Sequence, residues 1–159
     1  MLASALVLGL IAAIATGGEL KRLGSIQLRL WPVLLLAVAL RVVATLTFSG
    51  WAFAISLFAI VLVCVANNRL PGLALVGAGT TLNLIVVVAN VGMPVSQSAL
   101  ENANATLPQD GVHIAMSSAT TLNWLGDILP VSIVRGVYSL GDVISAVGAF
   151  ALPVIQSRR

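Results

Sequence analysis

Residues 30–72 read LWPVLLLAVALRVVATLTFSGWAFAISLFAIVLVCVANNRLPG, and this stretch decides the fold. It holds two apolar runs, 30–48 and 51–66, separated only by Ser49-Gly50, which is a minimal turn. The two runs are therefore expected to form an antiparallel pair of helices. Trp31 and Trp51 each begin one run, so they fall at opposite ends of the pair, and tryptophan favours both interfaces of a bilayer. The stretch predicts two membrane-crossing helices.

The composition supports a membrane protein. Of the 159 residues, 59% are hydrophobic and only 8% are charged, and the mean hydropathy is +1.08. A soluble domain has roughly 25% charged residues, so this chain cannot cover a water-facing surface. The basic pI of 10.0 does not indicate nucleic acid, because the few basic residues flank apolar runs. The expected partners are the lipid bilayer and other membrane subunits or second copies of the chain.

Three further apolar runs extend this pattern along the chain, at 2–18, 72–90 and 137–155. Lys21 and Arg22 follow the first run and no basic residue precedes it, which is the reverse of a signal peptide. We therefore expect a retained helix. The fold class predicted is an all-α membrane protein, a single domain over 1–159 with a bundle of five transmembrane helices.

The basic residues predict which way the bundle faces. Six of the eight Lys and Arg residues follow the first, third or fifth run: Lys21, Arg22, Arg29, Arg69, Arg158 and Arg159. Cytoplasmic loops retain Lys and Arg. The N-terminus is therefore expected outside the membrane and the C-terminus in the cytoplasm.

The long connection between the fourth and fifth helices, 91–136, is expected to be an ordered extracytoplasmic cap. Its apolar residues include Trp124 and Leu125, and each large apolar side chain gains roughly 1.5–3 kcal/mol on burial. We expect these two residues to be anchored on the bundle. Within the segment, 96–104 is predicted as a short helix, with Ser98 and Glu101 spaced as a capping box.

Polar residues in or near the apolar runs give the candidate site. Arg41 lies inside the second run, where a charge costs about 2.5–3.5 kcal/mol, so we expect it to contact Asp142 or, failing that, Asp127. Asn83 and Asn90 are seven residues apart and share one helix face. These five residues are expected to gather under the cap. Two interpretations of such a cluster remain open: hydrogen bonds that hold the helices together, and a site for a ligand or ion. The third interpretation is that Arg41 extends to the membrane interface without contacting the other residues.

The sequence carries little sign of catalysis. Leu-Gly-Asp occurs at 125–127 and 140–142, and the second copy faintly resembles the Gly-x-Gly-Asp motif of intramembrane aspartyl proteases. Ser139 replaces the first Gly, however, so an acidic residue at a helix N-terminus is the simpler interpretation. His113 is the single histidine and Cys64 the single cysteine, so neither a metal site nor a cofactor is predicted. We interpret His113 as a surface residue of the cap.

Several motifs resemble a bacterial membrane family that is known only as a domain of unknown function. They are Asn-Leu-Ile-Val-Val-Val-Ala-Asn-Val-Gly-Met-Pro-Val-Ser at 83–96, Trp-Leu-Gly-Asp at 124–127, Ser-Leu-Gly-Asp at 139–142, Gly17-Gly18 and the turn at 68–72. The family pattern has Gly where this chain has Val91. The resemblance implies a multi-pass protein of the bacterial plasma membrane and supplies no activity.

Three hypotheses for the function follow. The leading one is a non-enzymatic accessory or binding subunit with a polar site under the cap, near the outer leaflet. The alternative is a small transporter or channel that works as an oligomer, although no internal repeat is evident. The third is an intramembrane enzyme that uses Asp127, Asp142 or His113.

Overall fold

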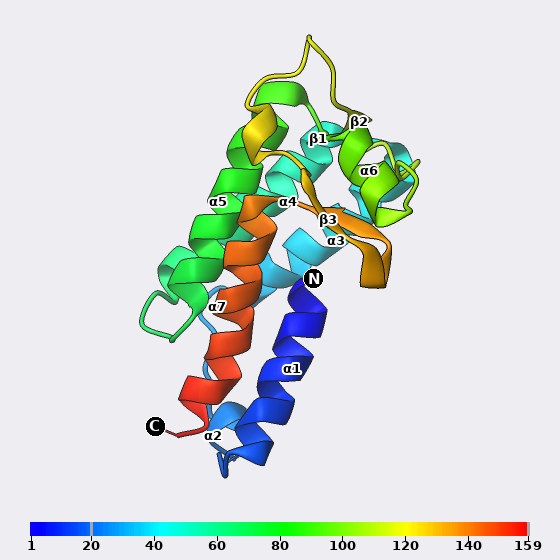
Figure 1. Ribbon diagram of the computed structural model, residues 1–159. Coiled ribbons are helices and arrows are strands. Elements are labelled where there is room, and N and C mark those ends of the chain that lie inside the picture. Colours follow the sequence, from blue (N-terminus) through cyan, green and yellow to red (C-terminus); the bar gives the residue numbers. More distant parts are fainter. Residues whose placement is uncertain (20, 159) are drawn as a thin grey trace.

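The computed structural model describes residues 1–19 and 21–158, and the chain is mostly helical in this part (Figure 1). Arg159, grouped above with the cytoplasmic basic residues, lies outside the described residues. The long helices are α1 (Leu2–Ala15), α3 (Trp31–Thr47), α4 (Gly50–Ala66), α5 (Leu73–Asn90) and α7 (Leu140–Gln156), and α2 (Lys21–Gly24) is a single turn.

The five long helices fall where the apolar runs are. By length and composition, α5 is the one described helix that is able to cross a membrane, while α1, α3, α4 and α7 are apolar but shorter. Helix α7 begins at Leu140 and not at the predicted residue 137, because Gly136–Tyr138 pair as a strand and Ser139 caps the helix.

The segment between α5 and α7, residues 91–139, is hereafter called the connection. Its elements are β1 (Met93–Val95), α6 (Gln97–Ala103), β2 (His113–Ala115), η1 (Asn123–Leu125), β3 (Leu129–Val131), η2 (Ser132–Val134) and β4 (Gly136–Tyr138). Strands β1 and β2 are parallel, and β3 and β4 are antiparallel. The expectation of an all-α chain is therefore wrong in this segment, where strand pairing satisfies the backbone between the helices.

Helix α6 confirms the predicted short helix but corrects its cap. Ser96 is the N-cap and its hydroxyl accepts from the backbone N–H of Ala99 at 3.4 Å. Ser98 lies inside the helix, and Glu101 accepts a hydrogen bond from Gln97. Only Ser98 has a glutamate three residues later, but Ser96 is the N-cap because the chain leaves β1 with Ser96 in an extended conformation.

The helices pack in the order α3–α4–α5–α7–α1 (Figure 1). Glycines allow the closest approaches along this row. A Cβ atom at Gly79 would overlap the carbonyl oxygen of Gly141 in α7, and one at Gly9 would overlap that of Phe150. Helix α7 is thus held between α5 and α1 by backbone contacts that a larger residue would prevent.

The connection packs on the upper ends of α3, α4 and α5 through one apolar core. That core consists of Ala44, Phe53, Ala54, Val86, Val87, Met93, Val112 and Leu125. Leu125 is anchored as expected, but Trp124 is 62% exposed, so the expectation that it packs on the bundle is wrong. The 3-10 turn of Asn123–Leu125 presents consecutive side chains in different directions, and only Leu125 faces inward.

Val91 adopts a backbone conformation that suits glycine. It ends α5 with a φ of 54° and a ψ of 30°, in the left-handed region. A β-branched residue is strained there, whereas glycine is not. The family pattern resembled above has glycine at this position, which agrees with the geometry.

We therefore predict that Val91→Gly raises the free energy of unfolding by about 1 kcal/mol through release of this strain. Val88→Gly is the matched control, since Val88 is similarly exposed but lies inside α5. It should lower stability by about 1 kcal/mol. Thermal unfolding of the purified variants measures both, and a Val91→Gly variant no more stable than the wild type would contradict the prediction.

Candidate functional site

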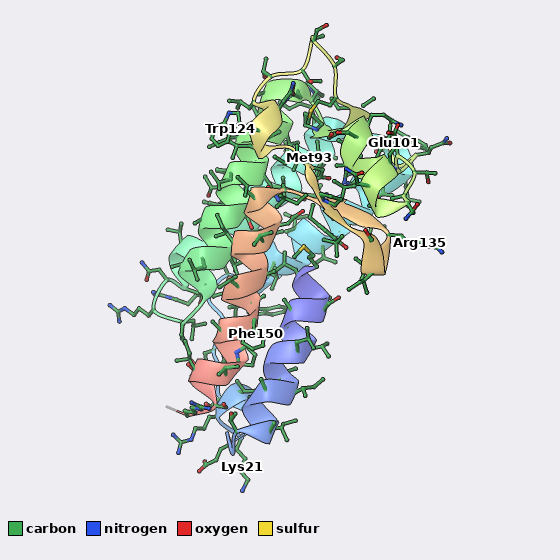
Figure 2. All side chains as sticks on the ribbon, viewed as in Figure 1. Lys21, Met93, Glu101, Trp124, Arg135 and Phe150 are labelled. Atoms are coloured by element: carbon green, nitrogen blue, oxygen red, sulfur yellow. The ribbon has the colours of Figure 1, made fainter. Side chains whose placement is uncertain are left out.

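A cavity of about 250 Å³ lies where the helix bundle meets the connection. All five long helices contribute to its wall, together with Met93, His113 and Asp127 of the connection. Figure 2 shows Met93 at this junction. Four of the five residues predicted to cluster, Arg41, Asn83, Asp127 and Asp142, line the cavity.

Asn83 and Asp142 join α5 to α7 by hydrogen bonds. The Asn83 side-chain amide donates to Oδ1 of Asp142 at 2.9 Å, and the Ser139 hydroxyl donates to Oδ1 of Asn83 at 2.8 Å. Ser139 and Asp142 also form a capping box, in which the Asp142 N–H donates to Ser139 Oγ and the Ser139 N–H donates to Asp142 Oδ2. Both oxygens of Asp142 therefore accept hydrogen bonds, Oδ1 from α5 and Oδ2 from the N-cap of its own helix.

Arg41 reaches the cavity without meeting a carboxylate. Its guanidinium carbon lies 3.8 Å from the centre of the Phe53 ring. Among the described residues, no ion pair within 4.0 Å includes Arg41. The predicted contact with Asp142 or Asp127 is thus wrong. Helix α3 packs on α4 and not on α7, and a cation over an aromatic face gains a favourable interaction without a carboxylate.

Asp127 is a buried carboxyl group held by its own backbone. Its N–H donates to the carbonyl of Pro94 at 2.8 Å, and its carbonyl accepts from the N–H of Ser96 at 2.9 Å, so β1 positions it. The residue is 4% exposed, and its buried Oδ1 atom has no hydrogen-bond partner. Burial raises the pKa of Asp127 to about 8; nearby Asp142 adds to the increase and Arg41 opposes it. The carboxyl group is therefore mostly protonated at neutral pH.

His113 is a site residue that the sequence interpretation missed. It is not a surface residue, because its side chain is 19% exposed and its Nδ1 atom lies 2.8 Å from Oδ2 of Asp110. Its Nε2 atom lies 3.7 Å from Oδ2 of Asp127. Burial raises the pKa of Asp110, but His113 and the N–H groups of Val112 and His113 outweigh burial and lower it. The Asp-x-x-His spacing at 110–113 was the available signal.

A smaller cavity of about 130 Å³ lies on the connection side of the same residues. His113 and Asp127 line both cavities, and Arg135 and Tyr138 contribute to the wall of the smaller one. His113 and Asp127 thus lie between the two cavities.

Asn90 belongs to a different contact. Its side-chain amide donates to the carbonyls of Val86 and Thr121, and its Oδ1 atom accepts from the Thr121 N–H at 2.8 Å. It shares a helix face with Asn83, but seven residues place it about 10 Å further along α5, above the cavity. Asn90 ties the connection to the end of α5.

The arrangement is suited to binding through charge and hydrogen bonds. The Asp142 side chain accepts hydrogen bonds from Asn83 and Ser139, and among the described residues no hydrogen bond joins it to Asp127, so the structure gives no sign of a proton shared between two aspartates. Among residues 1–19 and 21–158, no three His, Cys, Asp or Glu side chains are grouped to hold a metal ion. Arg41 and Asp127 both line the cavity, and within the described part of the chain neither the Arg41 guanidinium nor Asp127 Oδ1 has an ionic or hydrogen-bond partner.

The fold and the cavity define a mostly helical protein with a partly open polar site where the bundle meets the connection. Residues 21–154 match a family of unknown function, DUF5317, and the chain belongs to this family. Comparison with curated proteins and with solved structures finds no match.

The raised pKa of Asp127 predicts a pH-dependent stability. Between the ordinary pKa of 3.8 and about 8, the folded chain holds a proton that the unfolded chain has lost, so stability falls as the pH rises. The slope from this one group is at most about 1.4 kcal/mol per pH unit. His113, Asp110, Asp142 and Arg41 face the same region.

Asp127→Asn should therefore flatten the decrease in unfolding temperature between pH 5 and pH 8. Glu101→Gln, which changes an exposed carboxylate, is the control and should leave the decrease as it is in the wild type. An Asp127→Asn profile parallel to that of the wild type would show that Asp127 does not titrate in this range.

Proposed function

We propose that this chain is a multi-pass membrane protein in which α1, α3, α4, α5 and α7 cross the bacterial plasma membrane. The N-terminus and the connection lie outside, and the C-terminus lies in the cytoplasm. Large apolar side chains on the outer faces support this, since Leu35, Val42, Leu46 and Ile55 are each more than half exposed. Surfaces of this kind are stable in lipid and not in water.

The lengths of the helices fit a bilayer with some adjustment. A 17-residue helix is about 25 Å long, against about 30 Å of hydrocarbon, and tilt or local thinning accommodates the difference. Helix α1 is shorter still and occupies only the lower half of the molecule (Figure 1). The connection lies around the upper ends of the other helices, and its β3–β4 hairpin turns down to about mid-height (Figure 1). Ile133, in the turn between β3 and β4, is 96% exposed. An apolar residue so exposed fits the outer membrane interface.

The distribution of charge supports the same orientation. Figure 2 shows Lys21 at the lower end of the molecule and Glu101, Trp124 and Arg135 on the connection. Arg22 and Arg158 are close to Lys21 in the structure, because the turn after α1 meets the end of α7 at Ser157. Basic residues concentrated at one end favour that end for the cytoplasm.

Within this membrane protein, the polar cavity is a binding site and not a catalytic centre. The observation that carries this proposal is the pair of polar groups without matching partners, the guanidinium of Arg41 and Oδ1 of Asp127, in one cavity of about 250 Å³. Leaving such groups unmatched away from water is costly, and a bound polar molecule would satisfy both. The protein is thus an accessory or binding subunit that takes its ligand under an extracytoplasmic cap.

A small transporter working as an oligomer is the second candidate. His113 and Asp127 line both the polar cavity and the smaller cavity in the connection, so a path from outside passes between them. A transporter that uses these titratable groups would move protons together with its substrate. Proton flux into liposomes that contain the protein and a pH-sensitive dye would favour this candidate over a binding subunit.

The orientation is tested by cysteine labelling in a Cys64→Ser background. Ser118→Cys in the connection and Asn68→Cys in the turn after α4 both introduce exposed thiols. A membrane-impermeant maleimide added to intact cells should label position 118 and not position 68, and lysis should make both reactive. Labelling of position 68 alone in intact cells would contradict the proposed topology.

The binding role is tested by native mass spectrometry of protein purified in mild detergent. The wild type should carry a small molecule, and Arg41→Gln should bind that molecule at least about tenfold more weakly. The reason is that a charge-assisted hydrogen bond is worth about 1.5–3 kcal/mol. Arg69→Gln, which changes an exposed residue of the turn after α4, is the matched control and should retain it. Equal occupancy in the wild type and Arg41→Gln would contradict the proposal, provided that their unfolding temperatures agree.

A further inference from the structure

A third cavity, apolar and of about 500 Å³, adjoins the polar one and is open on one side, since its lining residue Val38 is 56% exposed. All five long helices line it, and its wall is made almost entirely of aliphatic side chains such as Leu6, Val38, Val63 and Leu152. Its volume lies within the range of pockets that hold small molecules. In a membrane, such a space is suited to a hydrocarbon chain.

The packing order of the helices explains this cavity. The row α3–α4–α5–α7–α1 curls, so that its two ends, α1 and α3, face each other across the cavity without packing closely. Ala3 and Ala149 are among the lining residues and are too short to fill the space. The space between α1 and α3 is therefore incompletely filled by side chains.

The two cavities meet at shared residues. Leu2, at the start of α1, and Ile60, in the middle of α4, line both of them. A molecule that extends past these two side chains has its polar part beside Arg41 and its apolar part beside Val38, which lies three residues earlier in α3.

The polar cavity carries both signs of charge. Arg41 offers a guanidinium group, which suits the planar geometry of phosphate. Asp127 and Asp142 offer carboxyl oxygens, and a carboxyl oxygen accepts two hydrogen bonds, so the engaged oxygens of Asp142 retain capacity. Because Arg41 and these carboxyl groups do not pair with one another, the cavity is complementary to a zwitterion.

From these observations we infer that the ligand is a zwitterionic amphiphile that carries a phosphate, an amine and an alkyl chain. Its phosphate binds Arg41, its ammonium group faces the carboxylate of Asp142 and donates a hydrogen bond to the mostly protonated carboxyl group of Asp127, and its chain lies in the apolar cavity between α1 and α3. This inference rests on the proposed binding function and names the class of ligand for the same site.

The test uses the full chain in detergent micelles that contain equal amounts of phosphatidylethanolamine and phosphatidylglycerol, followed by native mass spectrometry. The wild type should retain phosphatidylethanolamine in preference to phosphatidylglycerol. Val38→Trp, which fills the apolar cavity, should lower retention about tenfold, since excluding two methylene groups is sufficient for that effect. Val42→Trp is the matched control, because Val42 is as exposed as Val38 on α3 and lines neither cavity.

A chainless head group, glycerophosphoethanolamine, separates this inference from the proposed function. Binding of the chainless compound as tightly as the lipid, with no effect of Val38→Trp, would overturn the amphiphile and leave a polar binding site. Preference for phosphatidylglycerol would overturn the zwitterionic head group. Failure of every compound to bind, with no effect of Arg41→Gln, would overturn the binding function itself. The two tryptophan variants should unfold at the same temperature as the wild type. A loss of lipid retention can then be attributed to filling of the apolar cavity.

Discussion

The close contact between α5 and α7 is the constraint on which the other features depend. Gly79 and Gly141 bring the two backbones together, and at that distance the Asn83 side chain can bond both Asp142 and Ser139. Side chain and backbone thus cooperate, because a Cβ atom at Gly141 would occupy the position of the Asn83 amide oxygen. Ser139 and Asp142, which both bond Asn83, also form the capping box at the start of α7. The connection therefore ends at this contact.

The connection is positioned by these helix ends, and the site follows from its position. Asn90 holds Thr121 at the end of α5, and the backbone of β1 holds both β2 and Asp127. The backbone of Asp127, and not its side chain, thus fixes the position of this residue. Its carboxyl group is buried there, and its pKa rises to about 8. Arg41 meets the same cavity from α3, where Phe53 is its nearest partner. The polar groups that hold the fold together are therefore Asn83, Asp142 and Ser139, whereas Arg41 and Asp127 are the ones available to a ligand.

The two interpretations considered for the polar cluster prove to be divided between its members. Hydrogen bonds between helices account for Asn83 and Asp142, and a turn contact accounts for Asn90. Neither accounts for Oδ1 of Asp127 or for the guanidinium of Arg41. A single chain can thus use one polar set for packing and a neighbouring set for recognition, provided that the helix row leaves space between them.

The sequence by itself determined the positions of the five long helices, because runs of apolar residues bounded by glycine, proline and asparagine leave little choice of secondary structure. It also indicated that Arg41, Asn83 and Asp142 line one region, since they lie at similar heights on their helices, and that Asp127 of the connection lies above them. The partners of these residues were decided only by the tertiary structure. Arg41 on α3 and Asp142 on α7 lie at the same depth but on helices that do not pack together, and helix depth says nothing about the order of helices around a bundle. The spacing of Asp110 and His113 was a local signal for their contact, but the approach of His113 to Asp127 depends on the tertiary structure. The four short strands could not be predicted either, because pairs such as β1 and β2 form between segments about twenty residues apart whose local sequence does not favour strands over turns.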